Sequence, residues 1–108
     1  MAKHELLIIT NYSEESRLTL EELCEICGIP VERVNEYISH AVITPTAGAV
    51  PQEWEFDLTQ LRRIKTALRL QHDLEINLQG AALVLDLLQE LEHLRAHAKL
   101  LEKHFSKL

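Results

Sequence analysis

The sequence is poor in the residues that interrupt helices. It contains only three glycines and three prolines among 108 residues, and 46% of its residues are hydrophobic. A chain of this length with so few turn-forming residues suits one compact, largely helical domain, or a small domain followed by one long helix. The length also excludes two ordinary domains, because each would need a hydrophobic core of its own.

Long apolar runs are missing as well. No stretch approaches the roughly 18 apolar residues of a membrane-spanning helix, and no positively charged leader precedes an apolar run as in a secretion signal. We therefore expect a protein that is neither exported by a signal peptide nor inserted in a membrane. Its expected location is the cytoplasm.

Catalytic motifs are absent too. The sequence has neither a glycine-rich phosphate loop nor a nucleophile elbow. Serines such as Ser13, Ser16 and Ser39 lie in turns or at helix ends, without a histidine and an aspartate nearby in sequence. The sequence thus predicts a protein that is not an enzyme and that holds no cofactor.

The two cysteines form a single C-x-x-C spacing, Cys24 to Cys27, which is typical of redox pairs and of half a zinc site. No second cysteine pair exists, no βαβ pattern surrounds this one, and both thiols fall on an apolar helix face. We interpret them as buried structural cysteines and predict no bound metal.

Three histidines near the C-terminus are the other possible metal ligands. His93 and His97 are four residues apart on one helix face, His104 follows one heptad later, and Glu90 is the nearest further ligand. Positions on the solvated flank of a coiled coil explain these histidines better. The alternative is a small metal or redox sensor, which would contain stoichiometric zinc.

The most informative stretch is residues 19–38, which has the pattern of two short helices joined by a glycine turn. Thr19 and Glu22 form a capping box, Gly28 can end the first helix in the left-handed conformation, and Pro30 presets the turn. The apolar stripes are Leu20, Leu23, Cys24 and Cys27 on the first helix and Val31, Val34 and Ile38 on the second. This pattern predicts a helix-turn-helix.

Two short β-like segments lie on either side of this motif. Residues 5–10 end in β-branched residues, and in residues 53–56 Trp54 and Phe56 alternate with carboxylates, as on a half-buried strand. We expect the two segments to pair as a small wing. Residues 44–51, with two prolines and a glycine, form the loop that leads into it.

A third helix is predicted from Asp57, which forms a capping pattern with Gln60, to about His72. Its buried stripe is Leu58, Leu61, Ile64 and Leu68, and its exposed face carries Arg62, Arg63, Lys65 and Arg69. We interpret this basic strip as a solvated face that pairs with acidic residues of the head. A nucleic-acid patch is the alternative, although aromatic residues are missing nearby.

The helix-turn-helix region is strongly acidic. Residues 11–40 contain seven glutamates against Arg17 and Arg33, a net charge of −5 in a chain whose total is −6. Binding to a polyanion draws most of its free energy from Lys and Arg side chains that neutralise phosphates, so this surface would repel DNA. A basic partner fits it better.

The last predicted helix is capped by Asn77 and runs from Gly80 to the C-terminus without glycine or proline. Its apolar residues recur at alternating steps of three and four, the heptad pattern of a coiled-coil seam. These residues are Val84, Leu87, Leu91, Leu94, Ala98, Leu101, Phe105 and Leu108. From Leu78 onward the helix would be on the order of 45 Å long, so its far half needs a partner, most simply a second copy of the chain.

These elements divide the sequence into two parts. Residues 1–76 are expected to form a winged helix-turn-helix domain with an N-terminal strand, and residues 77–108 a coiled-coil helix through which two chains dimerise. The fold class is therefore mainly α, with a short β wing.

The order of these elements resembles the MerR-type winged helix from Thr19 to the C-terminus. Within that fold, the run from Arg69 to Leu91, RLQHDLEINLQGAALVLDLLQEL, and the WEFD sequence that starts at Trp54 are similar to the chaperone modulatory protein CbpM family. The long run is fairly specific, whereas many regulators share the helix-turn-helix. Residues 1–16 extend beyond the usual start of the family.

The chain departs from the DNA-binding members of that fold. Where their second helix usually carries an arginine and paired tyrosines, this chain has ERVNEY from Glu32 to Tyr37, and where their wing has arginine beside tyrosine it has EWEF from Glu53 to Phe56. Carboxylates thus largely replace the positive charges that contact phosphates. Double-stranded DNA is therefore not the expected ligand, and a MerR-type DNA-binding transcription regulator is the alternative function.

The resemblance to CbpM implies a protein partner. A member of this family binds the J-domain of a DnaJ-like co-chaperone, CbpA, and blocks its stimulation of a DnaK-type chaperone. J-domains present a basic helix to that chaperone, so an acidic competitor is physically reasonable. We expect the contact residues to be exposed carboxylates on rigid helices, which lose little entropy on docking. They are Glu21, Glu22 and Glu25 on the first helix and Glu32 and Glu36 on the second, with Asp73 and Glu75 as the next candidates.

Overall fold

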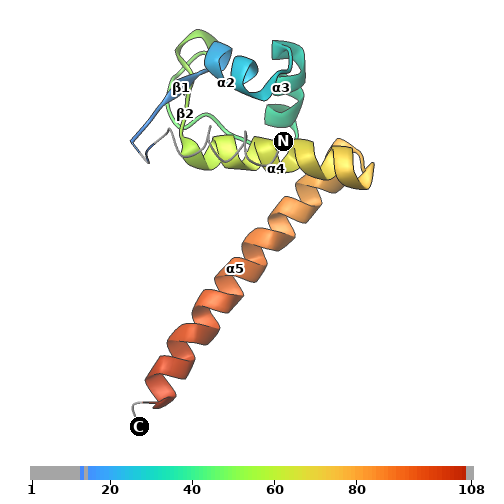
Figure 1. Ribbon diagram of the computed structural model, residues 1–108. Coiled ribbons are helices and arrows are strands. Elements are labelled where there is room, and N and C mark those ends of the chain that lie inside the picture. Colours follow the sequence, from blue (N-terminus) through green and yellow to red (C-terminus); the bar gives the residue numbers. More distant parts are fainter. Residues whose placement is uncertain (1–12, 14, 107–108) are drawn as a thin grey trace.

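A computed structural model describes residue 13 and residues 15–106, which form a small helical head and one long helix that projects from it (Figure 1). In chain order the elements are β1 (Leu18–Thr19), α2 (Leu20–Cys27), α3 (Val31–Ser39), the 3₁₀ helix η1 (Pro51–Glu53), β2 (Glu55–Phe56), α4 (Leu58–Leu74) and α5 (Leu78–Ser106). The expected mainly α architecture, a winged helix-turn-helix followed by a long terminal helix, is confirmed.

The wing is a two-stranded antiparallel sheet. Leu18 of β1 pairs with Phe56 of β2, and Thr19 pairs with Glu55. Leu18 and Phe56 are both buried, so this short ladder places two apolar side chains in the core of the head. The wing therefore joins the start of α2 directly to the start of α4.

The predicted pairing partner of the wing strand is wrong. Residues 53–56 were expected to pair with residues 5–10, which lie outside the residues that the structure describes. The strand is also shorter than expected, because Pro51–Glu53 form a 3₁₀ turn. Glu55 pairs with Thr19 on one side and forms a β-bridge with Ala47 on the other, so both of its neighbouring positions are occupied.

Local side-chain caps fix the ends of α2 as the sequence predicts. The Thr19 hydroxyl accepts a hydrogen bond from the Glu22 backbone N–H at 3.1 Å, and the Glu22 carboxylate accepts one from the Thr19 N–H at 3.0 Å. Gly28 ends the helix in the left-handed conformation, at φ 67°. Because a residue with a Cβ pays a steric cost at this φ, glycine suits the turn between α2 and α3.

The same kind of cap starts the two longer helices. The Asp57 carboxylate accepts from the Gln60 N–H at 3.1 Å, and the Asn77 amide oxygen accepts from the Gly80 N–H at 2.8 Å. Both predicted caps are thus confirmed. α4 ends two residues later than predicted, at Leu74 rather than His72.

The core of the head lies where α2, α3, β2 and α4 meet. Its largest fully buried side chains are Tyr37, Phe56, Leu23, Ile43, Leu61, Ile64, Val34 and Val42. The predicted stripe of α3 is wrong at one end, because Val31 is 39% exposed. Val31 is the first residue of α3 and lies next to the turn at Pro30. The buried residues of α3 are Val34 and Tyr37, and Tyr37 is not part of the predicted stripe.

α5 packs against the head only through its first turns. Ala81 and Leu85 are buried, and Leu78 and Ala82 pack on the same core from partly buried positions. Residues 86–106 are all exposed. At 1.5 Å per residue these 21 exposed residues account for roughly 30 Å of helix. None of the described helices combines the length and the apolar character of a membrane-spanning segment.

Candidate functional site: the acidic face of the head

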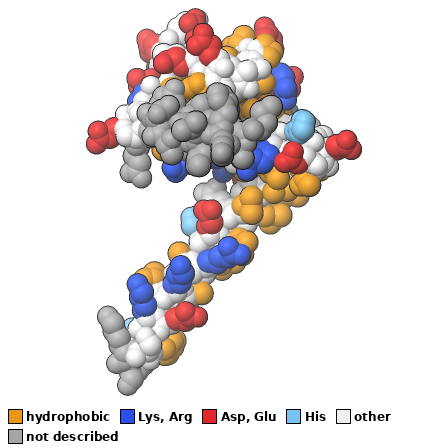
Figure 2. Space-filling model, in the orientation of Figure 1, with side chains coloured by type: hydrophobic (Ala, Val, Ile, Leu, Met, Phe, Trp, Pro, Cys, Tyr) orange, Lys and Arg blue, Asp and Glu red, His pale blue; other side chains and the backbone are white. Residues whose placement is uncertain are grey.

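The exposed carboxylates of α2 and α3 lie together at one end of the head. Figure 2 shows acidic side chains gathered over the end of the head that α2 and α3 form. We call this surface the acidic face, and it consists of Glu21, Glu22, Glu25, Glu32 and Glu36, all of which are exposed. Because α2 is capped and both helices pack on the core, they hold these charges on a rigid support.

The five carboxylates of the acidic face are not equivalent. Glu22 is engaged in the capping box with Thr19, so its carboxylate already has a hydrogen-bond donor. Glu21 and Glu32 come from different helices, yet both raise the pKa of the Cys24 thiol, after the larger effect of its burial. Electrostatic interactions weaken with distance, so both carboxylates lie near that thiol.

Asp73 and Glu75 lie apart from the acidic face, at the junction of α4 and α5. The Asp73 carboxylate is 3.1 Å from Nδ1 of the exposed neighbour His72. Glu75 ends α4 in the left-handed conformation, at φ 53°, which is uncommon for a residue other than glycine. α4 separates this corner from the wing by its 17 residues, or roughly 25 Å.

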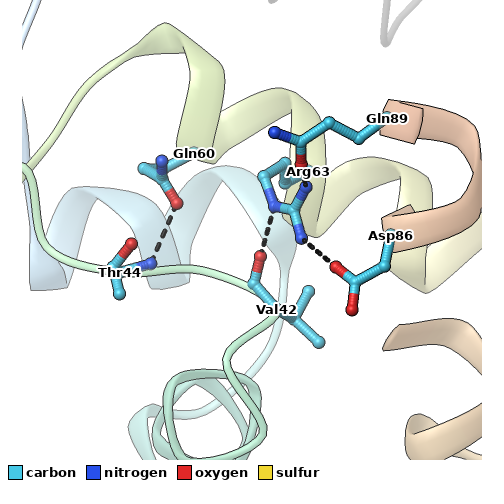
Figure 3. Close-up of polar contacts among 6 residues, drawn as sticks. All are labelled: Val42, Thr44, Gln60, Arg63, Asp86 and Gln89. Atoms are coloured by element: carbon cyan, nitrogen blue, oxygen red, sulfur yellow. Dashed lines mark hydrogen bonds and ion pairs between the residues drawn. The ribbon is translucent and has the colours of Figure 1, made fainter. Parts of the chain in front are cut away.

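The basic strip of α4 is only in part the solvated face that the sequence predicts, because Arg62 and Arg69 are exposed whereas Arg63 and Lys65 are partly buried. Arg63 is largely buried, with 20% of its side chain exposed, and it joins three parts of the chain (Figure 3). Its Nε donates to the Val42 carbonyl at 2.5 Å, one terminal nitrogen donates to Gln89 at 3.2 Å, and the other lies 3.7 Å from the Asp86 carboxylate. Arg63 therefore pairs with α5 rather than with the acidic face.

Two more polar contacts hold the helix-turn-helix on α4. The Lys65 ammonium donates to the Ile26 carbonyl at 3.3 Å, so this second member of the basic strip also has a structural role. The buried Tyr37 hydroxyl donates to the Gln71 amide oxygen and accepts from Arg33. Sequence patterns do not reveal this Tyr37 network, because the Gln71 partner on α4 lies 34 residues away.

The predicted dimerisation seam is exposed in the single chain. Leu87, Leu94 and Phe105 expose 59%, 63% and 65% of their surface, and Leu91 and Leu101 expose 41% and 45%. Of the other seam positions, Val84 is partly buried and Ala98 is exposed, while Leu108 lies outside the described residues. Dimerisation through these residues stays a prediction.

The seam lies on the opposite side of α5 from the head. Leu78 and Leu87 are nine residues apart, which is about 2.5 helical turns. Leu78 packs on the core and Leu87 points away from it, so a second helix could contact the seam without displacing the head.

The prediction of two buried cysteines is only partly right, because both thiols are partly buried. Cys24 and Cys27 are both free and partly buried, and burial raises the pKa of Cys27 to about 11. Burial is the main cause of the raised pKa of both thiols, and it disfavours the thiolate that redox and metal chemistry need. Within the described ranges no three His, Cys, Asp or Glu side chains come together as a possible metal site.

Comparison with known proteins adds independent information. Residues 18–103 match the model of the MerR HTH family regulatory proteins. A chaperone modulatory protein CbpM from Coxiella burnetii is 39% identical over 88 residues, which cover 82% of each chain. Proteins of the same name from Pseudomonas entomophila and Pseudomonas putida are 31% and 32% identical over 91 residues, covering 84% of this chain and 89% of theirs.

Proposed function

Since this chain belongs to the MerR-type helix-turn-helix family and, within it, to the chaperone modulatory proteins named CbpM, we propose that it modulates a chaperone through a protein partner. The partner is the J-domain of a DnaJ-like co-chaperone of the CbpA type. By occupying that J-domain, the protein inhibits stimulation of a DnaK-type chaperone. It works as a binding protein without catalysis or cofactor, as a homodimer joined through α5, in the cytoplasm.

The observation that carries this proposal is the negative charge of the acidic face. In a DNA-binding helix-turn-helix the second helix enters the major groove, and its Lys and Arg side chains neutralise phosphates. Here α3 and its neighbour α2 present exposed carboxylates, and Arg33, the cation of α3, donates to the Tyr37 hydroxyl. Such a surface attracts a basic protein helix and repels a phosphate backbone.

The first experiment measures binding directly. Purified protein is titrated into the J-domain of a DnaJ-like co-chaperone by calorimetry at low and physiological salt, and inhibition is read from the ATPase rate of a DnaK-type chaperone. Reversing Glu32 and Glu36 to Lys should slow association and weaken binding by about 1–3 kcal/mol while leaving the circular dichroism spectrum unchanged. Unchanged affinity at low salt would move the contact surface elsewhere.

A matched variant tests the second candidate surface. Reversing Asp73 and Glu75 to Lys changes the net charge by the same amount, but at the corner between α4 and α5. If the acidic face is the contact surface, this variant should bind almost as wild type does, with only a long-range loss that salt screens. A larger loss at the corner than at the acidic face would assign binding to the corner.

The family's regulatory members make DNA binding the second candidate function. A transcription regulator would bind a specific site far more tightly than other DNA, with affinity that falls steeply as salt rises. A mobility-shift experiment with genomic fragments at physiological salt separates the two functions. We expect no saturable, sequence-selective shift, and one would decide in favour of DNA.

A further inference from the structure

A hollow of about 770 Å³ opens on the acidic face, between α2, the first residue of α3 and η1. It is lined by Thr19, Leu20, Glu21, Cys24, Glu25, Val31, Pro51 and Gln52. The segments that form it are far apart in sequence, so the hollow exists only because the wing brings η1 beside α2. Its size is in the range of protein pockets that hold small ligands or side chains of a partner.

The hollow has an apolar floor with charged edges. Leu20 and Cys24 are four residues apart and follow one line along α2, while Glu21 and Glu25 follow the adjacent line. Val31 closes the opposite side and is 39% exposed although it is apolar. An apolar side chain that entered here would therefore contact Leu20, Cys24 and Val31 and would have carboxylates beside it.

The carboxylates at the edges of the hollow have no cationic partner among the described residues. In the part of the chain that the structure describes, the side chains of Glu21, Glu25 and Glu32 take part in no hydrogen bond or ion pair. Glu21 and Glu25 line the hollow, and Glu32, which follows the lining residue Val31, acts with Glu21 on the Cys24 thiol, so three carboxylates lie in or near it. A ligand that carries positive charge around an apolar group would satisfy both features.

We propose that this hollow receives an apolar side chain from a basic amphipathic helix of the partner, with Lys or Arg residues one turn on either side of that side chain meeting Glu21, Glu25 and Glu32. The inference rests on the proposed function, because the J-domain helix is the partner it describes. Beyond that function, the hollow gives the position at which the partner's apolar side chain is anchored. The partner's contact residues would then form a basic helix with one exposed apolar side chain. Glu22 contributes little, since its carboxylate caps α2.

Cys24 allows a test on the folded, full-length protein. The thiol is modified with pyrene maleimide, which fills the hollow, and the site of modification is identified by mass spectrometry. Affinity is then measured for two probes, the purified J-domain of a DnaJ-like co-chaperone and a synthetic amphipathic helix made of Leu and Lys. We expect modification to raise the dissociation constant for both probes at least ten-fold.

Matched variants separate a blocked hollow from a damaged fold. Cys24→Ser protein treated with the same reagent should bind both probes as untreated wild type does, and its circular dichroism spectrum should be unchanged. Reversing Glu21 and Glu25 to Lys should also raise the dissociation constant about ten-fold at low salt, more than reversing Asp73 and Glu75.

The outcomes distinguish this inference from the proposed function. If the J-domain binds equally well to modified protein, the hollow is not the anchor site, although the proposed function stands. If only the synthetic helix binds and modification abolishes its binding, the hollow is supported and the J-domain is the wrong partner. If neither probe binds, or if modification changes the oligomeric state instead, the inference is overturned.

Discussion

Replacing two seam leucines of α5 with aspartate should convert a dimer into monomers. Leu94 and Leu101 expose 63% and 45% of their surface in the single chain, which together amounts to about one leucine side chain per chain. Burying a leucine is worth about 1.5–3 kcal/mol, so the two chains of a dimer gain roughly 3–6 kcal/mol from this pair. At 1.4 kcal/mol per factor of ten, Leu94→Asp with Leu101→Asp should weaken dimerisation about 10²–10⁴-fold.

The assay is sedimentation velocity at micromolar concentration, with circular dichroism to check that α5 remains helical. Leu100→Asp is the matched control, because Leu100 is 67% exposed but lies off the heptad seam. It should leave the dimer intact. Monomeric wild-type protein at this concentration would refute the reasoning, and so would a Leu100→Asp variant that dissociates as fully as the double variant does.

Three further predictions concern the head. Arg63→Met removes the charged donor from the Val42 carbonyl and should lower the free energy of unfolding by about 1–3 kcal/mol in urea denaturation, whereas Arg62→Met, at an exposed position, should change it little. Tyr37→Phe leaves the Gln71 amide without its donor and should cost about 1 kcal/mol in the same experiment; an unchanged midpoint would mean that this bond adds nothing net. Burial raises the pKa of Cys27 from 9 to about 11, so the unfolded chain loses this proton at lower pH than the folded protein does. The contribution of Cys27 to stability is therefore complete below pH 9 and is lost as pH rises towards 11, and the slope between these values should be smaller in Cys27→Ala.

The parts of the fold that depend on neighbouring residues could be predicted from sequence. The caps at Thr19, Asp57 and Asn77 each join residues three apart, and the left-handed turn at Gly28 follows from one residue type. The exposed carboxylates of the acidic face could also be identified, because helical periodicity assigns the buried positions and leaves them over.

Contacts between distant residues could not be predicted in the same way. Arg63 falls on the polar side of α4 in any helical pattern, but its partners Val42 and Gln89 are 21 and 26 residues away and lie on elements that only tertiary packing brings near. The same reason explains the wing, where β1 rather than an earlier apolar segment pairs with β2. The hollow beside Cys24 could not be predicted for the same reason, since Pro51 and Gln52, which help to line it, are more than 25 residues away in sequence.

The exposed length of α5 has a consequence for how such a protein can change. Because residues 94–106 are exposed and, among the described residues, make no polar contact with the head, α5 could gain or lose a whole heptad beyond His93 without altering the head. Seven residues would keep the seam in line and move the far end by about 10 Å, whereas an insertion of four would displace the seam by a fraction of a turn. Insertions and deletions tolerated in this half of the helix should therefore come in multiples of seven, while the first turns of α5 should tolerate none.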